Sequence, residues 1–251
     1  MKITAIQTKK IYPGEDLVPL LFTSLPPLLE QQVLVISSKI LSLSYGYFLD
    51  KDSLKSSKDA LIKQEADQYW QASKDAPIQL TLKENLLIPF AGIDESNGAG
   101  TYVLFPKNLF THTMDLWNTL RNHYHLKEFG ILVVDSQITP LRRGTVGLGL
   151  SWCGFHPFYS YRGRKDCFNH TYQLTDLNLV DAYATAAIVE MGEGDEQTPL
   201  ALIDQAPKIQ FMSRPPTKEE QTSMSIIREE DLFSPLFYGH QPHEGGENAS
   251  M

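Results

Sequence analysis

The chain has 251 residues, of which 42% are hydrophobic and 21% charged, a composition typical of a soluble globular protein with one large or two small domains. Its net charge of −8 argues against a nucleic-acid partner, and its sequence has no apolar run of about 18 residues that would predict a membrane span. Because Cys153 and Cys167 are too few for a disulfide framework and the N-terminus is not signal-like, we expect a cytoplasmic protein with reduced thiols.

Short apolar strands and amphipathic helices alternate irregularly along the chain. Apolar runs predict strands at Lys2–Ile6, Gln32–Ser38, Leu86–Phe90, Tyr102–Phe105, Gly130–Val134, Val146–Trp152 and Leu200–Ile203. Helical spacing predicts helices from the Pro13–Asp16 turn to Phe22, over Ser57–Ala72, over Phe110–Leu126, and over Asp176–Met191 with Thr175 as its N-cap. This order favours an α+β fold, with mixed sheets and packed helices, over a doubly wound sheet.

The composition shifts after about Ser213 toward proline, glutamate, serine and glycine. We therefore divide the chain into one large, two-lobed domain, residues 1–212, and a C-terminal extension, residues 213–251. Within this extension we expect a short docked helix over Ser225–Phe237 and disorder from Gly239 onward.

The strand predicted at Val146–Trp152 is both apolar and rich in glycine. Glycine inside a strand often marks a place where another backbone comes close. We therefore expect another element of the protein to approach this strand closely.

Two carboxylates stand out because each follows an apolar, strand-like segment. Asp94 lies in AGIDESN (residues 91–97), and Asp135 ends the run ILVVD (residues 131–135). Side chains at strand ends are held rigidly, and two converging carboxylates repel each other unless a cation lies between them. They predict a divalent ion with oxygen ligands, such as Mg²⁺. The alternative is that both aspartates form turns for local reasons.

Four motifs follow one another along the chain: AGIDESN (residues 91–97), RRGTVG (142–147), YRGRKD (161–166) and MGEG (191–194). Together they resemble the coenzyme F420:L-glutamate ligase family of nucleotide-dependent γ-glutamyl ligases, from near the N-terminus to about Ile203. The stretches MGEGDEQTPLA (191–201) and APKI (206–209) are most similar to a branch described as folate γ-glutamate ligases. The resemblance also implies a homodimer.

The resemblance places the metal ligands of the family on Asp94, Asp135 and Glu193, with Ser136 where many relatives have threonine. They imply a Mg²⁺ or Mn²⁺ site, with K⁺ as a further ion. Phosphoryl transfer relies on positioned charges, so the expected catalytic residues are Asp94, Asp135 and Arg143. For Glu193, a simpler interpretation is a helix end stopped by Gly194.

The resemblance implies GTP or ATP as the nucleotide. Its expected contacts are Ser38, Lys39, Asn97, Met191, Gly192 and Gly194. Many relatives have lysine where this chain has Leu43, so we expect Lys39 or Arg143 to supply the missing charge. We also expect Leu43→Lys to tighten nucleotide binding or to leave it unchanged.

A basic cluster in YRGRKD (residues 161–166) is a candidate acceptor site. Arginine can bind a carboxylate or phosphate through two parallel hydrogen bonds. We assign Arg162 and Arg164 to the acceptor's acidic tail, and Tyr159 and Tyr161 to its aromatic ring. The alternative is a solvated surface with salt bridges.

These interpretations lead to a metal- and nucleotide-dependent γ-glutamyl ligase. It would join L-glutamate to a carboxylate of folate through an acyl phosphate. The first alternative is the same reaction on F420-0. A nucleotide-binding regulatory protein without catalysis, which Leu43 favours, and a metal-dependent phosphohydrolase remain as further alternatives.

Overall fold

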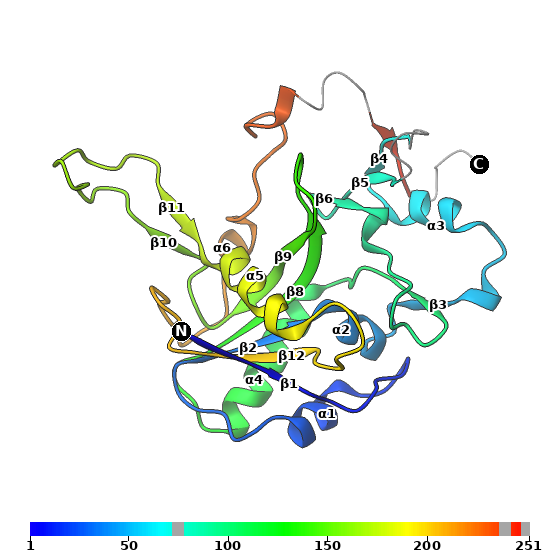
Figure 1. The fold of residues 1–251 in the computed structure, drawn as a ribbon, viewed down its shortest axis with the longest axis horizontal. Coiled ribbons are helices and arrows are strands. Elements are labelled where there is room, and N and C mark those ends of the chain that lie inside the picture. Colours follow the sequence, from blue (N-terminus) through cyan, green and yellow to red (C-terminus); the bar gives the residue numbers. More distant parts are fainter. Residues whose placement is uncertain (72–77, 236–241, 247–251) are drawn as a thin grey trace. The chain divides into compact units, whose positions relative to one another are not determined.

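The computed structural model describes residues 1–71, 78–235 and 242–246, and the chain forms two compact units (Figure 1). The first unit contains Met1–Ile11, Asp16–Leu41 and Asn108–Gln221; the second contains Tyr12–Glu15, Ser42–Lys107 and the chain from Thr222 onward. Strands of both orientations and helices are mixed, which confirms the expected α+β class. Among the described residues, no helix combines the length and apolar character needed to cross a membrane.

A five-stranded sheet forms the core of the first unit. Its strands, in spatial order, are β1 (Lys2–Ile6), β12 (Leu200–Asp204), β2 (Gln32–Ser37), β8 (Phe129–Ile138) and β9 (Thr145–Cys153). Only β2 and β8 are parallel neighbours; the other pairs are antiparallel. The strands predicted at β1, β2, β9 and β12 are therefore confirmed within one residue at either end, whereas β8 runs four residues beyond the prediction.

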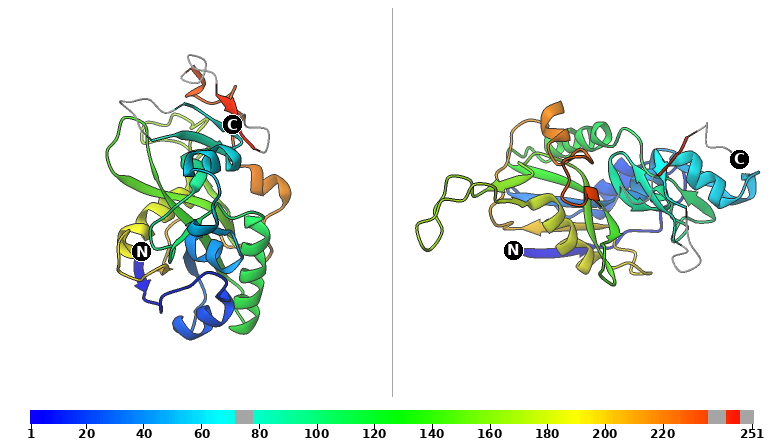
Figure 2. Two further views of the ribbon diagram at one scale, coloured as in Figure 1. Left: turned by 90° about the vertical axis from the view of Figure 1, so that its right-hand side faces the viewer. Right: turned by 90° about the horizontal axis from the view of Figure 1, so that it is seen from above.

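Two helices, α4 (Leu109–His123) and α5 (Leu179–Met191), lie on opposite faces of this sheet (Figure 2). A bulge between Val133 and Val134 shifts the register of the β8–β9 pair. On one side of the bulge, Gly147 and Gly149 face α5; on the other, the hydroxyls of Ser151 and Thr113 of α4 are 2.6 Å apart. The predicted close approach to the glycine-rich strand is thus confirmed, and the approaching element is α5.

The first unit also carries α1 (Leu17–Ser24), the start of α2 (Ser38–Ser44), and a hairpin of β10 (Phe158–Ser160) and β11 (Asp176–Asn178). The hairpin extends away from the sheet of its own unit (Figures 1 and 2). Its pairing corrects the predicted helix start at Asp176. Because Asp176–Asn178 pairs with Phe158–Ser160, the helix begins only at Leu179, and Asn178 replaces Thr175 as the N-cap by accepting from the Asp181 N–H.

The second unit combines two small sheets with short helices. One sheet has the order β13 (His243–Glu244), β4 (Gln68–Tyr69), β5 (Leu80–Lys83) and β6 (Leu86–Pro89); the other pairs β3 (Phe48–Asp50) with β7 (Thr101–Val103). The helical elements are α3 (Lys58–Glu65) and the 3₁₀ turns η1 (Lys51–Ser53) and η2 (Phe90–Gly92). Its core cluster consists of Leu61, Ile62, Ala66, Tyr69, Ala91 and Ile93.

The helix predicted over Ser57–Ala72 is too long. Ser57 does cap α3 by accepting from the Ala60 N–H, but the helix ends at Glu65. The next backbone donors pair with β5: the Asp67 N–H with the Leu82 carbonyl and the Trp70 N–H with the Leu80 carbonyl, both at 2.9 Å. Strand pairing therefore overrides helical periodicity here; the last predicted residue, 72, lies outside the described residues.

The C-terminal extension also differs from the prediction. The helix expected from Ser225 is replaced by turns and irregular backbone through residue 233, and residues 236–237 lie outside the described part. A helix, α6 (Lys218–Thr222), forms instead further upstream. Beyond Gly239, where disorder is expected, His243 and Glu244 pair with β4; residues 236–241 and 247–251 are outside the description.

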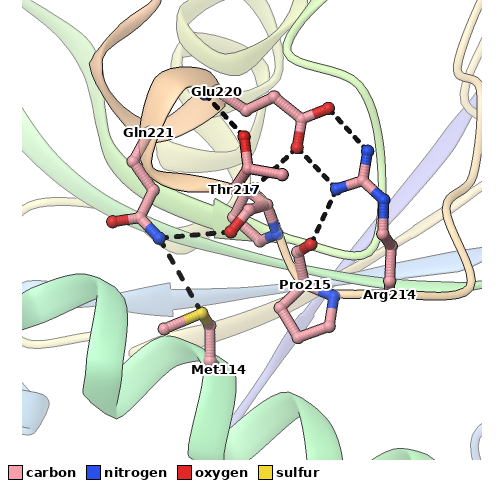
Figure 3. Close-up of polar contacts among 7 residues, drawn as sticks. Met114, Arg214, Pro215, Thr217, Glu220 and Gln221 are labelled. Atoms are coloured by element: carbon pink, nitrogen blue, oxygen red, sulfur yellow. Dashed lines mark hydrogen bonds and ion pairs between the residues drawn. The ribbon is translucent and has the colours of Figure 1, made fainter.

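The start of α6 is fixed by a reciprocal capping box at Thr217 (Figure 3). The Glu220 N–H donates to Thr217 Oγ1 at 3.2 Å, and the Thr217 N–H donates to the Glu220 carboxylate at 2.7 Å. Arg214 binds both oxygens of that carboxylate, at 2.6 and 2.9 Å. The Arg214 guanidinium and then the Thr217 N–H lower the pKa of Glu220 to about 2.

Candidate active site

The structure brings Ser38 and Asp135 together at one edge of the large sheet. The parallel pairing of β2 and β8 ends at Ser37 and Val134. The next residues face each other, and Ser38 Oγ donates to Asp135 Oδ2 at 3.0 Å. The other oxygen, Oδ1, accepts from the Ser136 N–H at 2.8 Å. The end of the parallel pairing of β2 and β8 therefore places a half-buried carboxylate beside a buried serine hydroxyl.

The sequence predicts that the strand ends at Asp135, but the structure shows that it does not. β8 continues to Ile138 by pairing with β9. The prediction missed this extension because Ser136 and Gln137 break the apolar run, although their backbone groups still pair with β9. Asp135 marks the end of the parallel pairing alone, so its backbone is held on the β9 side while its side chain meets Ser38.

The loop after α5 begins and ends near this same edge. Gly192 caps α5 with a φ of 76°, and the Thr198 hydroxyl donates to the Met191 carbonyl. At the other end, the Ser37 N–H donates to the Pro199 carbonyl at 2.9 Å. The loop with Gly192, Glu193 and Gly194 is therefore anchored one residue from Ser38, and the Glu193 side chain is exposed.

The donor set at this edge suits a hard divalent cation. Asp135 contributes a carboxylate and Ser38 a hydroxyl, and both are oxygen donors of the kind that Mg²⁺ and Mn²⁺ accept. Within the described part of either unit, however, no three Asp, Glu, His or Cys side chains gather closely enough to form a metal site by themselves. A metal at Asp135 would therefore depend on hydroxyl, water or substrate oxygens for its remaining ligands.

Asp94 belongs to the second unit and is held differently from the prediction. β6 ends at Pro89, and the left-handed residues Phe90, Ala91 and Gly92 turn the chain before Asp94. Asp94 then forms an isolated bridge with Val103 of β7, with hydrogen bonds of 2.9 Å in both directions. Its carboxylate accepts from the N–H of Ser96 at 2.7 Å, the local turn that the alternative interpretation predicts.

Two further candidates for nucleotide contact are Lys39, which follows Ser38, and Asn97, which follows Asp94 by three residues. Lys39 is half-buried in the first turn of α2, directly after Ser38. Asn97 is exposed in the second unit, in the turn after Asp94, with a φ of 53°.

Leu43 is 2% exposed. The expected effect of Leu43→Lys on nucleotide binding stays a prediction, and the burial adds an expected cost in folding stability. A lysine there would bring an ammonium group into an apolar environment, and the cost of removing this charge from water destabilises the folded state.

Arg143 lies away from Asp135 within the first unit. It is exposed in the turn of the β8–β9 hairpin, beyond the last pair, Ile138 with Thr145. Ile138 lies three residues beyond Asp135 along the strand, which corresponds to roughly 10 Å. The structure of this unit thus does not bring the predicted catalytic arginine to the Ser38–Asp135 pair.

The predicted acceptor arginines lie on the β10–β11 hairpin. Arg162 forms an ion pair with Asp176 at 2.5 Å. The Arg164 guanidinium lies over Tyr159 and Tyr161, 4.6 and 5.7 Å from the ring centroids, so the predicted combination of cation and aromatic surface is present.

Lys208, which the sequence reasoning did not single out, joins this group at 4.5 and 5.2 Å from the same rings. Lys208 follows the end of β12, where Asp204 accepts from Gln32 at the start of β2. The cluster is therefore at the sheet edge opposite to Ser38 and Asp135, about 17 Å away along β2.

A second charged group lies beside Asp94 and was also missed. Lys51 and Lys58 both form ion pairs with Glu95. Nothing in the spacing of these residues indicates the group, because the pairing of β3 with β7 and the course of α3 bring it together.

Comparison with known proteins identifies the family. A family model described as F420-0:Gamma-glutamyl ligase matches residues 5–205. A protein named Coenzyme F420:L-glutamate ligase from Methanococcus maripaludis (strain C6) is 26% identical over 249 residues, covering 93% of this chain and 97% of the relative.

Proteins with the same name from other archaea are similar as well. The one from Methanopyrus kandleri is 28% identical over 210 residues, covering 77% of this chain and 82% of its own length. The one from Methanocaldococcus jannaschii is 27% identical over 192 residues, covering 70% and 76%. Since the family model spans most of the sequence, the chain belongs to the F420-0:gamma-glutamyl ligase family.

Proposed function

We propose that this protein is a ligase that joins L-glutamate to the terminal carboxylate of F420-0, using a nucleoside triphosphate. The observation that carries the proposal is the Ser38–Asp135 pair, 3.0 Å apart at the end of the parallel strands, in a chain of this family. F420-0 takes the place of folate as the proposed acceptor because the relatives are named for F420. Folate becomes a competing substrate in the test.

The chemistry needs two transfers. An oxygen of the acceptor carboxylate attacks the γ-phosphorus, and the nucleoside diphosphate leaves; the glutamate amine then attacks the acyl carbon, loses a proton, and phosphate leaves. A bound Mg²⁺ or Mn²⁺ would neutralise charge on the phosphoryl oxygens. Asp135 and Ser136 are the proposed ligands, and the resemblance adds Asp94 and Glu193.

The residues of the chain contribute mainly by positioning. Ser38 donates to Asp135 and thereby orients one carboxylate oxygen, while the Ser136 N–H orients the other. The loop from Met191 to Thr198 is anchored beside Ser37 and would border the nucleotide. Lys39, Asn97, Gly192 and Gly194 remain proposed nucleotide contacts. Arg143, Arg162 and Arg164 lie away from the Ser38–Asp135 pair and are therefore left out of the proposal.

Asp135→Asn tests the proposal because it keeps the size of the side chain and removes its charge. We expect ligation to fall at least 100-fold and Mn²⁺ binding, followed by electron paramagnetic resonance, to weaken. Asp115→Asn, an exposed change on α4 of the same unit, is the control and should leave both unchanged. Near-normal ligation with Mg²⁺ in Asp135→Asn would contradict the assignment.

The acceptor is tested by offering F420-0 and dihydrofolate separately with L-glutamate, Mg²⁺ and either GTP or ATP. We expect the glutamylated product only with F420-0. Product only with dihydrofolate would restore the folate interpretation. Nucleotide hydrolysis without any product would favour a phosphohydrolase.

A further inference from the structure

Lys51, Lys58 and Glu95 form a compact charged cluster, here called the lysine clamp, in the second unit. Lys51 Nζ lies 2.9 Å from Glu95 Oε2, and Lys58 Nζ donates to the other oxygen, Oε1. The two ammonium groups therefore hold one glutamate carboxylate from both sides. Of the three residues, Glu95 directly follows Asp94 in sequence.

Both lysines are held in place independently of Glu95. Lys51 starts η1 after β3, and its Nζ lies 5.2 Å from the ring centroid of Tyr102 on the paired strand β7. Lys58 is the first residue of α3, and its Nζ lies 5.1 Å from the ring centroid of Phe90. Cation–π contacts of this kind restrict where a lysine head group can lie. The clamp thus presents two positioned cations.

The clamp carries two positive charges and one negative charge of its own. Glu95 is the main cause of the raised pKa of Lys51, and the two lysines, Lys58 before Lys51, lower the pKa of Glu95. All three side chains remain about one-third exposed, at 34%, 33% and 39%. Because an ammonium group has three donors, the clamp can accept a second carboxylate from solution or exchange Glu95 for it.

The segment that carries Glu95 has an unusual backbone. Phe90, Ala91 and Gly92 have φ values of 56°, 54° and 72° in succession, and two of them are not glycine. The turn is fixed by the Ala91 N–H, which donates to the buried Thr81 hydroxyl at 2.8 Å. Strained backbone of this kind is concentrated at functional sites.

We infer that Lys51 and Lys58 bind the side-chain carboxylate of the substrate L-glutamate, and that Glu95 occupies this position when the substrate is absent. Glu95 is itself a glutamate side chain, so its geometry shows that the two lysines fit such a carboxylate. Asp94, the neighbouring residue, is a metal ligand in the proposed function, on which this inference rests.

The inference predicts opposite effects for the two sides of the clamp. Lys51→Gln and Lys58→Gln each remove a cation and should raise the KM for glutamate about tenfold, with the nucleotide KM unchanged within about twofold. Glu95→Gln removes the competing carboxylate and should lower the KM for glutamate about threefold or more. Lys63→Gln, on the same helix but paired with Asp59, is the control and should change neither KM.

A merely structural role for Glu95 gives the opposite result, because losing two ion pairs would loosen the segment and raise the KM for glutamate. A higher or unchanged glutamate KM in Glu95→Gln would therefore overturn the exchange. If the lysine variants raise the nucleotide KM instead, the clamp binds phosphate and the inference is wrong.

Direct titration with L-glutamate separates this inference from the proposed function. By isothermal calorimetry, wild type should bind L-glutamate more tightly than Lys51→Gln and Lys58→Gln, and should bind L-glutamine, which lacks the carboxylate, poorly. If wild type shows this selectivity but no ligation, the clamp stands and the ligase proposal fails. If wild type ligates but the lysine variants bind glutamate normally, the clamp assignment fails alone.

Discussion

The contact between β9 and α5 gives a stringent test of how the first unit is built. A Cβ atom added at Gly147 would lie 2.3 Å from the carbonyl carbon of Ala184 and 2.4 Å from the nitrogen of Thr185. Carbon atoms in contact prefer about 3.5–4.0 Å, so Gly147→Ala must separate the helix backbone from the strand by about 1 Å. The helix is also bound there, because Thr185 Oγ1 donates to the Gly147 carbonyl at 3.1 Å.

Overpacking of this kind costs about 1–3 kcal/mol and occasionally more. Since backbone rather than a flexible side chain must yield, we expect Gly147→Ala to lower the free energy of unfolding by about 3 kcal/mol. Urea unfolding followed by tryptophan fluorescence measures the change, because Trp117 and Trp152 are both buried in this unit. Gly163→Ala, with a φ of +78° and open space around it, isolates backbone strain and should cost only about 1–2 kcal/mol. If Gly147→Ala loses less stability than Gly163→Ala, the packing argument is refuted.

Two further substitutions probe charge and burial. Arg214 depresses the pKa of Glu220 from 4.5 to about 2. The contribution of this ion pair to folding stability is therefore present above pH 4.5 and is lost as the pH falls toward 2. Glu220→Gln should therefore weaken amide-exchange protection of α6 at neutral pH by about 1 kcal/mol, allowing for solvent screening, with the difference from wild type shrinking as the pH falls from 4.5 toward 2; a difference that stays constant over this range would contradict this. Leu43→Lys should cost about 3 kcal/mol in urea unfolding, against less than about 1.5 kcal/mol for Leu43→Met, and equal losses would show that residue 43 reaches solvent.

Sequence patterns within a segment were sufficient to predict the elements whose structure follows from their own residues. Alternation and apolar runs locate β1, β2 and β12, and the glycines of β9 reveal that another element comes close. Such patterns fail to predict an element's bounds where pairing with a segment distant in sequence determines them. The helix predicted through Ala72 ends at Glu65 because β5 pairs with the following residues, and the helix predicted at Asp176 starts later because β10 pairs with β11.

The same division applies to the candidate site. The resemblance assigns Asp135 and Ser136 to the metal and Ser38 to the nucleotide, and the structure adds the hydrogen bond that joins Ser38 to Asp135. The lysine clamp could not be predicted from spacing, because its three residues come from η1, α3 and the Asp94 turn. The position of Lys208 could not be predicted for the same reason, because only the fold brings it next to Arg164 over the Tyr159 ring.

The position of β12 in the large sheet has a consequence for synthesis on the ribosome. β12 lies between β1 and β2, so β1, made first, has its sheet partner only after Leu200 has been added. At about 5–20 residues per second, this interval is on the order of 10–40 s. During this time only the β2–β8–β9 part of the sheet can assemble, and β1 must wait as an unpaired strand. Translation speed therefore sets how long the nascent chain exposes this strand.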